Sequence, residues 1–113
     1  MIKLTNLSKS YGSRKILNQI DLTICPGDFI GIVGPSGTGK STLLNIIGLL
    51  EDFDEGTYQF FEHNVSALSA KKLSALRNQY IGFVFQFFYL IPHLTVKDNI
   101  LLPIVYANQH IDL

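Results

Sequence analysis

The segment that decides the fold runs Gly34-Pro35-Ser36-Gly37-Thr38-Gly39-Lys40-Ser41, and Thr42 follows it. It matches the pattern G-x-x-x-x-G-K-[ST] at every fixed position. Such a loop needs glycines because successive backbone N–H groups turn inward around a phosphate, in conformations that a β-carbon obstructs. Lys40 would supply a cation for the β- and γ-phosphates, and the Ser41 hydroxyl is placed to ligate Mg²⁺. The segment therefore predicts a binding site for the phosphates of a nucleotide.

The residues on either side of this loop favour the same prediction. Residues 29–33 form a short apolar run without polar alternation, which is typical of a strand buried on both faces of a sheet. After the loop, apolar residues recur at the spacing of one helix face, at Leu43, Ile46, Ile47 and Leu50. That helix would point its positive end at the bound anion. The alternative is a glycine-rich turn that leads into a helix and binds nothing, and the flanking elements disfavour it.

The first part of the chain indicates antiparallel β structure. Apolar and polar residues alternate at residues 2–4 and again at residues 20–24, as expected for half-buried strands. Between them, the polar, glycine-containing residues 8–15 are typical of a turn. The acidic residues 51–55 read as a solvated loop, and residues 57–61 restart a β-prone segment.

The second part of the chain predicts two helices around an apolar strand. Residues 69–78 form a short helix that a serine can cap. Residues 80–85 are the strand candidate, which stops at Gln86. Thr95 then begins a helix that Pro103 kinks or ends about two turns later.

Composition excludes several classes of protein. A chain of 113 residues fits one domain at most. Nine Lys and Arg balance nine Asp and Glu, which argues against a nucleic-acid binder held by phosphate neutralisation. The longest nearly continuous apolar stretch, residues 80–91, is shorter than the ~18 to 20 residues that a membrane helix needs. We see no secretory signal at the N-terminus, and the single Cys25 fits a reducing compartment.

The phosphate-binding loop indicates only the class of ligand. The surrounding residues narrow the choice among the protein families that contain such a loop. A GTPase would need D-x-x-G and N-K-x-D after the loop. Here the D-x-x-G, residues 28–31, precedes the loop, and N-K-x-D is absent from the sequence. Small-molecule kinases usually begin with the strand that leads into the loop, whereas β-prone residues come first in this chain.

With these classes set aside, the sequence resembles the ATP-binding subunits of ABC transporters over nearly its whole length. Residues 90–100 resemble in particular the branch that exports macrolides, lipoproteins and bacteriocin-like peptides. Four further segments carry the family resemblance: residues 7–12 (LSKSYG, the adenine-contacting loop), 17–28 (the lead-in), 34–44 (the Walker A loop) and 81–86 (IGFVFQ, ending in the Q-loop glutamine).

The resemblance implies an α/β fold of the P-loop NTPase type. An N-terminal antiparallel β subdomain would precede the start of a mainly parallel sheet with helices. The β subdomain and Walker A core would occupy residues 1–65, and the helix, Q-loop strand and following helical region would occupy residues 66–113. Because the family's domain contains further motifs beyond these segments, we expect the chain to correspond to its N-terminal half.

The resemblance also implies ATP and Mg²⁺ as cofactors. Tyr11 would stack its ring on adenine, and Gln86 would ligate Mg²⁺ together with Ser41. The alternatives are a turn tyrosine packed on the β subdomain and an ordinary polar residue at a strand end. Lys40 and Gln86 would assist catalysis, although no catalytic set is complete. The predicted nucleotide site consists of Tyr11, Gly34, Pro35, Ser36, Gly37, Thr38, Gly39, Lys40, Ser41, Thr42 and Gln86.

Other family motifs are absent from this sequence. It has no L-S-G-G-Q signature. It also has no strand of four apolar residues that ends in Asp, and no Glu directly after such a strand to act as general base. Phosphoryl transfer to water needs a positioned nucleophile, so we do not expect this chain alone to hydrolyse ATP. The partners that the resemblance implies are a second nucleotide-binding subunit and a transmembrane permease that contacts the aromatic-rich residues 87–100. A packing role for these aromatics is the alternative.

The leading functional hypothesis is an ATP-binding subunit, here a fragment, that couples ATP binding and hydrolysis to export through a membrane permease. Such a subunit would be cytoplasmic and peripheral on the inner face of the cell membrane. The alternatives are a non-hydrolysing nucleotide-binding or permease-docking module and a truncated, inactive ATPase.

Overall fold

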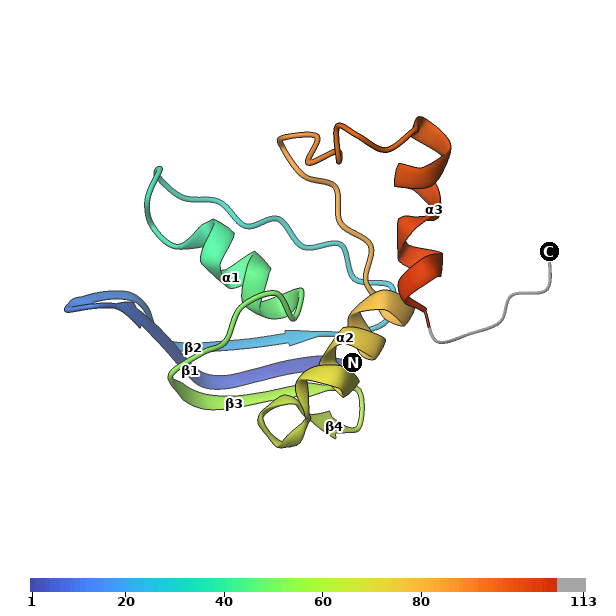
Figure 1. Cartoon of the computed structure of the whole chain (residues 1–113). Helices are drawn as coiled ribbons and strands as arrows, with labels where there is room; N and C mark the ends of the chain where they lie inside the picture. The colour runs from blue at the N-terminus through green and yellow to red at the C-terminus, as the bar shows by residue number, and fades with distance from the viewer. Residues whose placement is uncertain (108–113) are drawn as a thin grey trace. The chain divides into compact units, whose positions relative to one another are not determined.

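The computed structural model describes residues 1–107. The chain divides into two compact units, Met1–Ser69 and Ala70–Leu113, whose elements are labelled in Figure 1. Residues 108–113, at the end of the predicted second part, lie outside the described residues. Within residues 1–107, no helix is both long enough and apolar enough to cross a membrane.

The first unit is built on a four-stranded antiparallel sheet with the strand order β2-β1-β3-β4. The predicted antiparallel beginning of the chain is confirmed. The turn predicted over residues 8–15 consists only of Gly12 and Ser13, because both strands extend further than their apolar alternation indicates. The 3₁₀ helix η1, Val65–Ala67, follows the sheet. The strands are β1 (Ile2–Tyr11), β2 (Arg14–Ile24), β3 (Glu55–Phe60) and β4 (His63–Asn64).

Helix α1, Lys40–Ile47, lies over this sheet (Figure 1). Its buried residue is Ile46. From the sheet, the Tyr58 hydroxyl donates a hydrogen bond of 2.6 Å to the carbonyl oxygen of Ile47 and so fixes the end of the helix. Burial of this hydroxyl raises the pKa of Tyr58, so it stays a donor. The buried apolar residues of the unit are Leu4, Leu7, Leu17, Ile46, Leu49, Tyr58, Phe60 and Val65.

Two predicted strands are not strands in the structure. Residues 29–33 and 80–85 form no β ladder within residues 1–107, and Tyr80 instead ends a helix. A strand exists only as part of a hydrogen-bonded ladder, and the two segments belong to different units. Phe29 is 101% exposed, so no side chain of the first unit covers it.

The second unit contains two helices, α2 (Ala70–Tyr80) and α3 (Val96–Tyr106). The Asn78 amide nitrogen donates to the carbonyl oxygen of Pro103 at 2.7 Å and so joins them. The predicted cap of α3 is confirmed, because the Thr95 side chain accepts a hydrogen bond from the Asp98 backbone N–H at 3.1 Å. Pro103 does not end α3, which continues through Tyr106.

Candidate nucleotide-binding site

The phosphate-binding loop passes directly into α1 and rests against β2. Gly39 occupies the N-cap position with φ of 96°, in the left-handed region that favours glycine. A β-carbon at Gly39 would lie 2.8 Å from Cγ2 of Ile16 and 3.1 Å from Cδ2 of Leu17. The close approach of loop and strand therefore requires a glycine at this position, independently of any ligand.

The Lys40 side chain turns back over the loop that precedes it. Its Nζ donates hydrogen bonds to the carbonyl oxygens of Gly34 at 2.6 Å and Pro35 at 2.7 Å. Thr38 stabilises the same loop, because its hydroxyl donates to the Pro35 carbonyl oxygen at 2.7 Å. The ammonium group thus lies within reach of the loop backbone, where a phosphate cradled by that backbone would meet it.

A second cation contacts the loop from β2. The Arg14 guanidinium, at the start of β2, donates to the carbonyl oxygen of Gly37 at 3.3 Å. Sequence analysis did not find this contact, and no local pattern signals it because 23 residues separate the partners. Arg14 adds positive charge beside a loop that is predicted to bind an anion.

Ser41 and Thr42 occupy the first turn of α1. Ser41 is exposed, and its hydroxyl supplies one oxygen ligand at most. Among residues 1–107, no group of three or more His, Cys, Asp or Glu side chains is placed to hold a metal. This donor set fits Mg²⁺, which keeps several waters and takes most other ligands from phosphate oxygens. It does not fit a metal that needs a complete protein cage.

Tyr11 lies at the end of β1, and its hydroxyl reaches the neighbourhood of α1. The hydroxyl donates to the Glu51 carboxylate and lies 3.5 Å from Oγ1 of Thr42. The structure thus brings Tyr11, Thr42 and the loop–helix junction together in one unit. The acidic residues 51–55 are not simply a solvated loop, because Glu51 and Asp54 both bind groups of β1.

Gln86 lies in the second unit, within the exposed, irregular segment that follows α2. Its proximity to Lys40 and Ser41 stays a prediction, because the two units are described separately. Neighbouring aromatic rings pack on one another: the Phe83 and Phe85 rings stack with centroids 5.3 Å apart, and Tyr89 meets Phe85 edge-on at 5.1 Å. Part of the aromatic cluster therefore packs within its own segment, while Phe88 is exposed.

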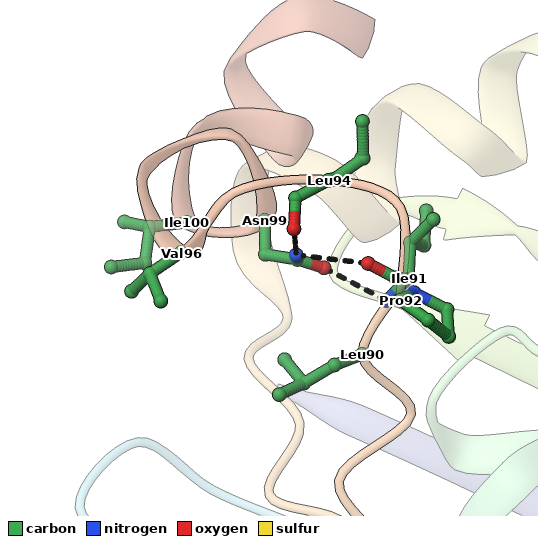
Figure 2. A pocket seen from close by; sticks show the side chains of 7 residues that line it. All are labelled: Leu90, Ile91, Pro92, Leu94, Val96, Asn99 and Ile100. Carbon is green, nitrogen blue, oxygen red and sulfur yellow. Dashed lines mark hydrogen bonds between the residues drawn. The ribbon is translucent and has the colours of Figure 1, made fainter.

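The segment after these aromatics forms an open apolar groove of about 280 Å³ (Figure 2). Asn99 shapes it from α3, because its side chain accepts from the Ile91 backbone N–H at 2.9 Å and donates to carbonyl oxygens of Ile91 and Leu94. Asn99 is the polar member of an otherwise apolar lining, which consists of Leu90, Ile91, Pro92, Leu94, Val96, Asn99 and Ile100.

A family model described as "ABC transporter" matches residues 17–112. The chain belongs to the ABC transporter family. The identification that rested on the Walker A loop and its flanking motifs is thereby confirmed, and transport and ATP binding are functions of this family.

Relatives of this ABC chain are ATP-binding proteins. YknY of Bacillus subtilis, an uncharacterised ABC transporter ATP-binding protein, is 48% identical over 112 residues, which cover 96% of this chain and 49% of YknY. LolD of Bacteroides fragilis, a lipoprotein-releasing system ATP-binding protein, is 48% identical over 96% of this chain and 50% of LolD. The macrolide export ATP-binding/permease protein MacB of Escherichia coli is 40% identical over 99% of this chain and 18% of MacB.

Solved structures confirm the predicted fold class. The dimeric structure of MJ0796, a bacterial ABC transporter cassette, gives a TM-score of 0.88 at 42% identity over 96% of this chain and 49% of that one. A dimeric post-hydrolysis state of the MJ0796 cassette, bound to ADP and Pi, gives a TM-score of 0.86 at 43% identity over 94% and 47%. The ABC chain thus spans about half the length of YknY, LolD and the MJ0796 cassette.

Proposed function

We propose that this chain is the nucleotide-binding part of an ABC ATPase that couples ATP binding and hydrolysis to export through a membrane permease. One observation carries the nucleotide part of the proposal. The Lys40 ammonium lies against the backbone of the glycine-rich loop, at the beginning of α1. Cation, loop backbone and helix N-terminus then converge on one place, and all three favour a bound phosphate.

Each predicted site residue has a role in this proposal. Residues 34–39 would surround the phosphates and hold them through the backbone N–H groups of every residue except Pro35, which has none, and Lys40 would contact the β- and γ-phosphates. Ser41 and Gln86 would ligate Mg²⁺, which when bound neutralises phosphate charge. Tyr11 would stack on the adenine ring, with Thr42 beside its hydroxyl.

Hydrolysis would need groups that this sequence does not contain. Lys40 and Gln86 can assist by binding and orienting the phosphates, but the signature and the catalytic glutamate are absent from the 113 residues. We propose that a second nucleotide-binding subunit takes part in completing the active site. Support comes from the MJ0796 cassette, whose solved structures are dimers.

The apolar groove of the second unit supports a permease partner. Its lining, which includes Leu90 and Ile100, is almost entirely aliphatic and suits the apolar face of an amphipathic helix. The exposed Phe88 extends the apolar surface on the same segment. With a permease partner, the chain would be peripheral on the cytoplasmic, inner face of the cell membrane, the location that the family resemblance implies. Export as the direction of transport rests on the similarity to LolD and MacB.

Nucleotide binding is tested by ligand-dependent stability. Mg·ATP at about 100 times its dissociation constant should stabilise the folded chain by about 2.7 kcal/mol, seen as a rise in the thermal unfolding midpoint. Lys40→Ala should weaken ATP binding at least about tenfold, because it removes a charge-assisted contact. Lys3→Ala is the matched control, because Lys3 is exposed on β1 and its substitution removes the same charge as Lys40→Ala does. A midpoint that ATP does not move, or moves equally in both variants, contradicts the proposal.

A further inference from the structure

Tyr11 connects three parts of the first unit through one hydroxyl group. Its hydroxyl donates to Oε1 of Glu51 and lies 3.5 Å from Oγ1 of Thr42. Thr42 belongs to the first turn of α1, and Glu51 belongs to the loop that follows α1. The position of the Tyr11 ring is therefore set relative to the helix that begins at the phosphate-binding loop.

Lys9 holds the same ring from another side. Its Nζ lies over the Tyr11 ring, 5.6 Å from the centroid, at a distance typical of a cation–π contact. The Lys9 ammonium is itself held between two carboxylates, 3.9 Å from Oε1 of Glu51 and 3.8 Å from Oδ1 of Asp54, and the Lys9 side chain is only 14% exposed. Tyr11 is nevertheless 49% exposed, so its ring keeps accessible surface for a second stacking partner.

The strand end that carries Tyr11 is anchored separately from the tyrosine side chain. The Asp54 backbone N–H donates to the Ser8 carbonyl oxygen at 2.9 Å, and the Asp54 carboxylate accepts from the Ser10 N–H at 2.7 Å. The Glu51 carboxylate takes no part in these two bonds. Removing its charge should therefore disturb the orientation of the ring while the end of β1 stays in place.

We infer that Glu51, with Lys9, is a positioning residue that fixes the Tyr11 ring for stacking on the adenine of a nucleotide bound at the phosphate-binding loop. The inference rests on the proposed nucleotide site. A ring that is already oriented loses less conformational freedom when the base arrives, so binding is tighter without any new contact to the nucleotide. Glu51 acts on the ring through the Tyr11 hydroxyl and through Lys9.

The test compares two ligands that share the phosphates but not the base. Affinities for Mg·ATP and for Mg·tripolyphosphate are measured by calorimetry on the full chain and on Tyr11→Phe and Glu51→Gln. Tyr11→Phe keeps the ring and removes the hydroxyl, and Glu51→Gln keeps the shape and removes the charge. Tyr11→Phe removes the hydrogen bond to Glu51, and Glu51→Gln removes the charge that strengthens this bond and pairs with Lys9. Each should weaken ATP binding about fivefold and leave tripolyphosphate binding within about twofold. The double variant should lose less than the sum of the two single losses, because both changes act on the hydrogen bond between Tyr11 and Glu51.

Glu62→Gln is the matched control, because Glu62 is exposed and lies away from Tyr11 in the turn between β3 and β4. It should change neither affinity. Equal losses for both ligands would mean that Glu51 supports the loop or the fold, and unchanged ATP affinity in both variants would mean that the ring needs no positioning; either result overturns the inference and leaves the nucleotide site standing. A wild-type chain that binds neither ligand overturns the nucleotide site and this inference with it.

Discussion

Gly39 is the residue at which the loop, α1 and β2 meet. Its φ of 96° is costly for any residue with a β-carbon, and the space that a methyl group would need is taken by Ile16 and Leu17. Two independent constraints therefore act at one position. The Walker A pattern has a fixed glycine at this position, and the packing of the loop against Ile16 and Leu17 also requires one.

We predict that Gly39→Ala lowers the free energy of unfolding by about 1–3 kcal/mol, from backbone strain and from the contact with Ile16. Urea unfolding of the ligand-free chain measures this change. Gly31→Ala is the control, because a β-carbon at Gly31 would meet nothing within 4 Å, and its effect should stay within about 0.5 kcal/mol. Equal effects of the two substitutions would show that Gly39 is not a packing constraint.

Residues in the Walker A motif could be assigned from sequence because the motif is local. The loop, its lysine and the following helix are neighbours along the chain, and their chemistry follows from their order. The surroundings of Tyr11 could not be assigned in this way. Glu51 is 40 residues away from Tyr11 in sequence, and an acidic run with few apolar residues predicts only exposure. Contacts between distant segments leave no periodic signal.

At the scale of elements, helices were predicted better than strands. The spacing that predicts α1 is confirmed by the burial of Ile46, and the cap that predicts α3 is confirmed by Thr95. Leu50, the last residue in the predicted stripe, lies beyond the end of α1 and is exposed. Residues 29–33 and 80–85 have strand-like sequences, yet a strand depends on partners that local sequence does not specify.

Helix α3 provides the prediction that tests the permease partner. Ile100 lines the apolar groove and is 68% exposed, whereas Val105 on the same helix lies outside the groove lining and is 74% exposed. We predict that Ile100→Asp reduces binding to a permease at least about tenfold, because a carboxylate must be desolvated against an apolar helix. Val105→Asp, the matched control, should bind as the wild type does.

The probe for this experiment is the permease portion of E. coli MacB, immobilised in detergent without its own ATP-binding portion. The wild-type chain and both variants are captured on it, and their ATP affinities are measured in parallel to show that the first unit is intact. Equal capture of Ile100→Asp and Val105→Asp, or no capture of the wild-type chain, would contradict the assignment of the groove to the permease.

At the scale of the whole molecule, part of the high share of apolar residues lies on exposed surfaces. Apolar residues make up 47% of the sequence, and charged residues make up 16%. Large apolar side chains are nevertheless exposed in both units, among them Phe29, Val33 and Val84. These side chains lie in the two segments whose sequences suit a buried strand but which pair with nothing in the described part of the chain. Such segments offer both apolar surface and free backbone groups to another chain.

We therefore predict that the isolated chain self-associates reversibly, and that the double variant Phe29→Thr/Val33→Thr weakens this association at least about tenfold, because each substitution removes apolar surface that an associated chain would bury. Threonine keeps the strand propensity of residues 29–33, so a change in association reports on apolar burial and not on secondary structure. Sedimentation velocity across a dilution series measures the effect. Val105→Thr is the control, because Val105 is equally apolar but lies in a helix whose backbone bonds are internal. A monomeric wild-type chain, or equal association of the double variant and the control, would show that the exposed strand-like segment is not an interface.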